Sequence, residues 1–202
     1  MLSIINNFLF IHIPKTGGNS LQSVLLPFSD DHMTLPSPRH DGINRFEVRS
    51  STLDIHKHST LEDYRRQIDA ETFARLRKVA CIRNPWDRCA SFFFSPHRGS
   101  VQWSPEDFEN FIETSVKPHR DYLDIQGGNC DPFHNVDIVL RFEHLDEDFA
   151  KLCDTLEIPQ RNLPRVNSSK REHYRSYYTR RQSIDLVARK FSDEIARFGY
   201  IF

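Results

Sequence analysis

The sequence lacks the features that mark several specialised classes of protein. Its formal net charge is only −1, with 27 basic and 28 acidic side chains, so no overall positive field indicates nucleic-acid binding. No apolar run approaches the roughly 18 residues of a membrane span. The four cysteines form no Cys-x-x-Cys pair, the spacing typical of many metal and redox sites. Any bound anion must therefore be held by lysines and arginines placed locally.

Nothing in the sequence predicts a leader peptide. Residues 8–13 are apolar, but this run is too short for the hydrophobic part of a secretory signal, and no basic residue precedes it. We therefore expect a cytoplasmic protein, in which disulfides are rare. Cys81 and Cys153 lie among apolar residues and are expected to be buried free thiols. The length of 202 residues suits one domain, and we assign residues 1–202 to it.

Apolar runs alternate with segments of helical spacing along the chain. Three runs have the form of strands covered on both faces, at residues 8–13, 79–82 and 136–142. Residues 28–52 predict mostly loop with one short strand, and residues 184–198 predict one long helix. Strands alternating with helices indicate an α/β fold with a mainly parallel central sheet flanked by helices. In such sheets, ligands bind beyond the carboxyl ends of the strands.

Residues that favour helix starts mark several of the expected helices. Asn19 is expected to cap a short helix, and Ser59 with Glu62 has the form of a capping box. Asn84 and Ser104 each precede a proline, a residue that favours the first helical position. These signals predict where the helices after the first two strands begin.

The first expected strand runs into the sequence PKTGGNS, residues 14–20. Glycines after a strand let backbone N–H groups converge on an anion, and the start of a helix adds positive potential. Lys15 supplies a full charge, while Thr16, Asn19 and Ser20 supply further donors. The pattern GxxxxGK[ST] of ordinary P-loop proteins occurs nowhere in the chain. The segment thus predicts an anion site of another kind, the alternative being a glycine-rich turn with a solvated lysine.

A second candidate site follows the next expected strand, in the sequence CIRNPWDRCASFF. Arg83 closes the strand, and Ser91 lies eight residues further on, about two helical turns away. A guanidinium group at a strand end and a hydroxyl group on the adjoining helix can hold one phosphate group together. Arg88 adds to the positive field. The alternative is that Arg83 is a structural cation paired with a carboxylate.

Together these motifs resemble those of the sulfotransferases that use 3′-phosphoadenosine 5′-phosphosulfate. The segments HIPKTGGNS and RNPWDRCAS are similar to the Golgi-type carbohydrate sulfotransferases and their bacterial relatives. KHSTLEDY, VDIVLRFEHLDEDF and the closing FGY also resemble this branch, so the likeness runs from about residue 8 to 200. It implies a P-loop-like nucleotide-binding core. Relatives of the secretory pathway carry a membrane anchor, which we do not expect here, so the likeness favours the bacterial type.

The resemblance implies roles for individual residues. The 5′-phosphosulfate would be bound by six residues of the first motif: Lys15, Thr16, Gly17, Gly18, Asn19 and Ser20. Arg83 and Ser91 would bind the 3′-phosphate. The segment NSSKREHY would form a loop over the nucleotide, closed by Lys170 and Arg171, the alternative being that these two are solvated charges.

Sulfuryl transfer resembles phosphoryl transfer, because an oxygen attacks in line while charge grows on the leaving oxygen. Lys15 is suited to stabilise that charge. In the relatives, a Lys-His pair just ahead of a helix supplies the base, which corresponds to His58 in DIHKHST. His56 and His58 would otherwise be surface histidines or a metal pair, but no third ligand is evident nearby, so we expect no metal. His12, on the first strand, is expected to lie in the core.

The predicted activity is transfer of a sulfuryl group to a hydroxyl group, with a saccharide as the expected acceptor and adenosine 3′,5′-bisphosphate as product. Two other functions stay open. One is a kinase-like phosphotransferase, in which Glu143 after the third strand would be the residue to examine as a magnesium ligand. The other is a non-catalytic nucleotide-binding relative. The long loop at residues 121–133 is interpreted either as part of the acceptor cleft or as an inert surface loop.

Overall fold

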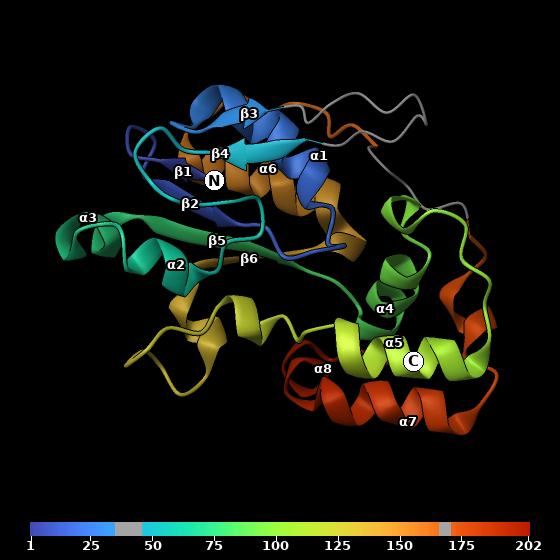
Figure 1. Cartoon of the computed structure of the whole chain (residues 1–202). Coiled ribbons are helices and arrows are strands. Elements are labelled where there is room, and N and C mark those ends of the chain that lie inside the picture. The colour runs from blue at the N-terminus through green and yellow to red at the C-terminus, as the bar shows by residue number, and fades with distance from the viewer. Residues whose placement is uncertain (35–45, 166–170) are drawn as a thin grey trace.

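A mainly parallel sheet forms the centre of the molecule. The structure is a computed structural model that describes residues 1–34, 46–165 and 171–202. Within these residues, a four-stranded sheet has the order β1-β2-β5-β6 (Figure 1). Its strands are β1 (Leu2–Ser3), β2 (Phe8–Ile11), β5 (Arg77–Ile82) and β6 (Ile138–Arg141). Strands β2, β5 and β6 run parallel, whereas β1 pairs antiparallel with β2 at one edge.

The central strands are apolar because helices cover both faces of the sheet. All four residues of β2 and the last four of β5 are buried. The register places Phe10 beside Val79 and Cys81 beside Leu140. Removing such side chains from water stabilises the fold by roughly 1.5–3 kcal/mol each. Cys81 and Cys153 are buried free thiols, as predicted.

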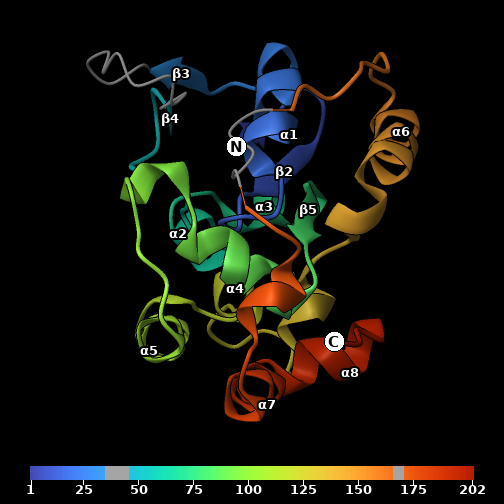
Figure 2. The same ribbon diagram turned by 90° about the vertical axis from the view of Figure 1, so that its right-hand side faces the viewer.

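Helices surround the sheet and extend beyond one end of it. They are α1 (Gly18–Leu25), α2 (Leu61–Arg65), α3 (Ala70–Arg75), α4 (Pro85–Phe93), α5 (Pro105–Ser115), α6 (Leu145–Leu156), α7 (Arg181–Lys190) and α8 (Ser192–Phe198). Short 3₁₀ helices occur at Leu26–Phe28, Pro96–Arg98, Arg120–Tyr122, Pro132–Asn135, Phe142–His144 and Tyr174–Tyr177. Figure 1 shows α1 and α6 above the sheet, and α4, α5, α7 and α8 grouped beyond its right-hand end. Figure 2 shows the same division, with α1 and α6 at the top and α5, α7 and α8 at the bottom. The α/β fold with a mainly parallel sheet flanked by helices is therefore confirmed.

Two of the predicted helix starts are confirmed. The side chain of Asn84 accepts the N–H of Trp86 at 3.0 Å at the start of α4. The side chain of Ser104 accepts the N–H of Asp107 at 3.1 Å at the start of α5. In both helices proline occupies the first position, where its missing N–H costs nothing.

Two other caps differ from the prediction. The capping box before α2 is formed by Thr60 and Asp63, because Ser59 is buried and its hydroxyl group instead accepts the N–H of His56. Helix α1 is capped by Gly17 rather than Asn19, which lies within the first helical turn. The turn before α1 requires a positive φ of 84° at its cap, a conformation that glycine adopts at little cost.

Three further elements depart from the sequence-based expectation. The expected C-terminal helix is divided into α7 and α8 at Phe191, whose buried side chain packs in the core. The segment expected to be mostly loop contains β4 (Glu47–Arg49), which pairs antiparallel with β3 (His32–Thr34). Only one short strand was expected there. Strand β1 was also missed, because two residues carry no periodic signal.

Candidate active site

A cavity of about 1180 Å³ opens where β2, β5 and β6 end. Its lining contains most of the residues selected from the sequence: Lys15, Gly17, Gly18, Asn19, Ser20, His58, Arg83, Ser91 and Arg171. Thr16 does not line the cavity, because its side chain is fully buried and its hydroxyl group donates to the carbonyl of Ile13 at 2.8 Å. Lys170 lies outside the described residues.

The loop between β2 and α1 places the start of the helix against the cavity. A Cβ atom on Gly17 would lie 2.8 Å from Cδ2 of Leu145, and one on Gly18 would lie 2.0 Å from Cδ2 of His12. Both glycines therefore permit packing too close for any side chain. Lys15 has a φ of 69°, a left-handed conformation that costs a non-glycine residue about 1–3 kcal/mol and clusters at functional sites.

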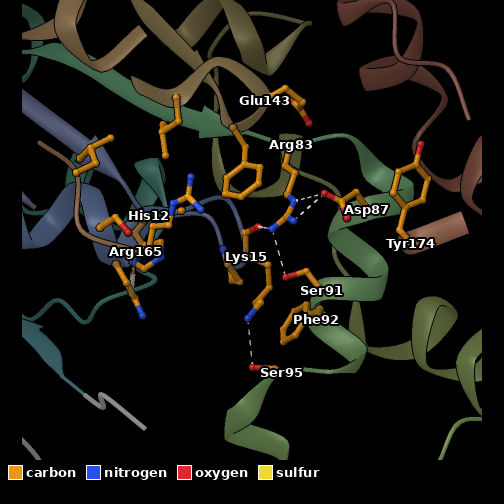
Figure 3. Close-up of a pocket in the computed structure, with 18 of the residues that line it drawn as sticks. His12, Lys15, Arg83, Asp87, Ser91, Phe92, Ser95, Glu143, Arg165 and Tyr174 are labelled. Atoms are coloured by element: carbon orange, nitrogen blue, oxygen red, sulfur yellow. Dashed lines mark hydrogen bonds and ion pairs between the residues drawn. The ribbon is translucent and has the colours of Figure 1, made fainter. Parts of the chain in front are cut away.

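The ammonium group of Lys15 reaches into the cavity (Figure 3). Its Nζ donates to the hydroxyl group of Ser95 at 3.4 Å, a long contact. Burial, and then the positive charges of Arg83 and Arg171, lower the pKa of Lys15 from 10.5 to about 8. The cavity therefore holds a lysine whose charge is poorly compensated by the protein, which favours the binding of an anion beside it.

Arg83 joins the two sequence motifs. It follows β5 directly, and its Nη1 donates to the carbonyl of Lys15 at 3.0 Å and to Oγ of Ser91 at 3.3 Å (Figure 3). Its Nε and Nη2 contact the carboxylate of Asp87 at 2.8 and 2.7 Å. The guanidinium group also lies 3.7 Å from the ring centre of Phe142. The pairing with Ser91 and the pairing with a carboxylate, which were alternatives in the sequence, therefore occur together.

Asp87 is shared between two guanidinium groups. Besides Arg83 it pairs with Arg171, which comes from the C-terminal part of the chain and is largely buried. The Nε of Arg171 has no hydrogen-bond partner among the residues that the structure describes. Two guanidinium groups thus share one carboxylate in a place poorly exposed to water, an arrangement that suits a further anion.

His58 lies on another wall of the same cavity. Its Nδ1 donates to the backbone carbonyl of His12 at 3.0 Å, so Nε2 is the nitrogen that carries a free electron pair. Burial lowers the pKa of His58 to about 4, so the ring is neutral at pH 7. The ring of His12, 4.5 Å away between centres, is buried as predicted but also lines the cavity. His56 is exposed and does not line it.

The family model described as "Sulfotransferase family" matches residues 4–201, nearly the whole chain. The chain belongs to the sulfotransferase family. No curated protein matches the chain. Membership supports a transferase that moves sulfuryl groups, on an α/β core of the P-loop-like type.

In this sulfotransferase, Glu143 serves the backbone around Arg83. Its carboxylate accepts the N–H of Asn84 at 2.6 Å and the hydroxyl group of Tyr200 at 3.2 Å. Both oxygens of the carboxylate that a kinase-like enzyme would offer to magnesium thus accept a hydrogen bond from the protein. Within the described parts of the chain, no group of three or more His, Cys, Asp or Glu side chains is arranged to bind a metal ion.

Several lining residues of the sulfotransferase site were not selected from the sequence. Asp87 had a signal, since it follows Arg83 by four residues at the start of a helix, where side chains so spaced meet. Phe142 follows β6 directly, as Arg83 follows β5. By contrast, no residue of the loop 121–133 lines the cavity.

The helices of the sulfotransferase are short. Across residues 1–34, 46–165 and 171–202, none is both long and apolar enough to cross a membrane.

Proposed function

We propose that this enzyme transfers the sulfuryl group of 3′-phosphoadenosine 5′-phosphosulfate to a hydroxyl group of a saccharide. The observation that carries the proposal is the position of Arg83, whose Nη1 contacts both the Lys15 carbonyl and the Ser91 hydroxyl group. One guanidinium group thereby brings two anion-binding motifs into a single cavity. A donor with a phosphosulfate on one side of its ribose and a phosphate on the other matches two such neighbouring sites.

Lys15 is the residue suited to stabilise the leaving group. The donor supplies the sulfuryl group, and negative charge grows on the oxygen that bridges sulfur and phosphorus. With a pKa of about 8, the ammonium group of Lys15 is mostly charged at neutral pH, and a nearby anion raises that pKa further. Backbone N–H groups at the start of α1, where Gly18 and Asn19 line the cavity, add to the positive potential.

His58 is the residue suited to take the proton from the acceptor. Because its Nδ1–H is donated to the His12 carbonyl, its Nε2 is available as a base without any change of tautomer. Its low pKa keeps it in the base form at neutral pH but makes it a weak base in the ligand-free protein. Negative charge placed beside it raises the pKa, so the base gains strength when the anionic donor occupies the cavity.

A saccharide acceptor follows from the resemblance of HIPKTGGNS and RNPWDRCAS to the carbohydrate branch of the family. Lys15, Arg83 and Arg171 supply the positive charge that a divalent metal supplies in many phosphotransferases. We therefore expect sulfuryl transfer to proceed in the presence of a chelator. Activity that is lost with the chelator and restored by magnesium would instead favour a phosphotransferase.

The experiment that tests the donor is calorimetry with adenosine 3′,5′-bisphosphate and with ADP. We expect tighter binding of the first, because a charge-assisted contact to the 3′-phosphate is worth roughly 1.5–3 kcal/mol, or about ten- to more than a hundredfold in affinity. Arg83→Ala should remove most of this preference. Arg181→Ala is the matched control, since Arg181 is exposed on α7 and does not line the cavity. Equal affinity of the native protein for the two nucleotides would refute the donor assignment. A strong preference without any transfer would indicate a non-catalytic relative.

A further inference from the structure

The bend between β5 and α4 is held by side chains from distant parts of the chain. The N–H of Arg83 donates to Nε2 of His119 at 3.3 Å, and the N–H of Asn84 donates to Glu143 at 2.6 Å. His119 is 1% exposed and does not line the cavity. It therefore contacts the backbone of Arg83 from behind, within the protein interior.

Glu194 on α8 determines which nitrogen of His119 carries the proton. The Nδ1 of His119 donates to one carboxylate oxygen of Glu194, and the other oxygen accepts the N–H groups of His119 and Arg120. Because Nε2 must accept the N–H of Arg83, it carries no proton, and the ring is neutral. Burial also lowers the pKa of His119, which agrees with a neutral ring.

A buried carboxylate requires positive charge nearby, and Arg88 provides it. Burial raises the pKa of Glu194, and the hydrogen bond from His119 and the charge of Arg88 act against it. Arg88 is fully buried, with Nε donating to the carbonyl of Pro14 at 3.0 Å and Nη1 to that of Lys117 at 2.8 Å. Arg88 thus contacts the loop after β2, and His119 contacts the bend after β5. Neither residue lines the cavity.

We propose that His119, oriented by Glu194, is a positioning residue for Arg83 and thereby sets the enzyme's preference for nucleotides that carry a 3′-phosphate. This inference rests on the proposed donor. The backbone of Arg83 must be held in place for its guanidinium group to meet Ser91 at 3.3 Å. Without Nε2 of His119, the buried N–H group of Arg83 loses its acceptor. Because an unpaired buried N–H group is costly, the backbone at the bend is expected to shift until this group finds another acceptor.

Two matched variants separate this role from a purely structural one. In His119→Asn, the side-chain amide takes the place of Nδ1 and can still donate to Glu194, but it does not reach the N–H of Arg83. In His119→Gln, the longer side chain reaches the place of Nε2 and can accept that N–H. The affinity for adenosine 3′,5′-bisphosphate relative to ADP is measured by calorimetry for both variants and the native protein.

We expect the preference to fall about three- to tenfold in His119→Asn, the size of one lost neutral hydrogen bond, and to be largely kept in His119→Gln. The affinity for ADP should be unchanged in both. An unchanged ratio in His119→Asn, the reverse order of the two variants, or an equal loss for both nucleotides would overturn the role of His119. A native protein without any preference would overturn the donor assignment itself, so the two failures are distinguishable.

A measurement on the native protein keeps the inference testable even where a variant does not fold. The nitrogen chemical shifts of the His119 imidazole should show a neutral ring protonated at Nδ1 in the presence and absence of nucleotide. A ring protonated at Nε2 could not accept the N–H of Arg83 and would overturn the proposal.

Discussion

Replacing Lys15 by methionine is expected to make the ligand-free protein more stable while removing its affinity for the nucleotide. Folding lowers the pKa of Lys15 from 10.5 to about 8, first through burial and then through Arg83, Arg171 and Lys57. At about 1.4 kcal/mol per pKa unit, the charged Lys15 destabilises the folded protein by at most roughly 3 kcal/mol. The actual cost is smaller, because the side chain keeps some contact with water. Methionine is unbranched and fills a similar space without charge. Losing the long contact to Ser95 removes less than about 1 kcal/mol. A net gain of about 2 kcal/mol remains.

The stability gained by Lys15→Met depends on pH. The cost of holding Lys15 charged is fully present below pH 8 and is lost as the pH rises from about 8 toward 10.5, because the folded protein then releases its proton first. The advantage of Lys15→Met should therefore shrink above pH 8. The free energies of unfolding of the variant and the native protein are measured by urea unfolding without ligand, at neutral and at alkaline pH. Calorimetry measures their affinity for the nucleotide. Lys151→Met is the control, since Lys151 is largely exposed, and should change stability by less than about 0.5 kcal/mol. A variant no more stable than the native protein at neutral pH would refute the reasoning.

Two further changes test the site. His58→Ala should lower turnover about a hundredfold or more, the common scale for a general base, and should leave nucleotide affinity nearly unchanged. In the control His56→Ala, steady-state turnover should stay near the native value. The opposite pattern would assign the role of base to His56. Gly18→Ala gains about 1 kcal/mol of helix propensity. Its Cβ atom, however, would lie 2.0 Å from the ring of His12, and the resulting overpacking should cost about 1–3 kcal/mol. Because the cost exceeds the gain, the midpoint of thermal unfolding should fall. Because the ring of His12 packs against that of His58, turnover should fall as well; an unchanged midpoint with native turnover would show that the ring yields without cost.

Local patterns in the sequence were sufficient to predict the fold class and to indicate the strand ends at which the candidate site lies. The runs that became β2 and β5 are recognisable because burial on both faces requires apolar residues in succession. The run that became β6 is also apolar, although β6 lies at an edge of the sheet and only Leu140 in it is fully buried. The carboxyl ends of parallel strands meet at one edge of a sheet, so the segments after β2 and β5 had to lie together. Proline after Asn84 and Ser104 marked two helix starts for an equally local reason.

Only the tertiary structure decided how the site is charged and supported. The contacts from Arg83 to His119, from His119 to Glu194 and from Asp87 to Arg171 join residues 36, 75 and 84 positions apart. No periodicity or short motif specifies such pairs, because they depend on how helices pack against the sheet. The low pKa values of Lys15 and His58 have the same origin, since burial, their largest cause, is a property of the packed molecule and not of the chain.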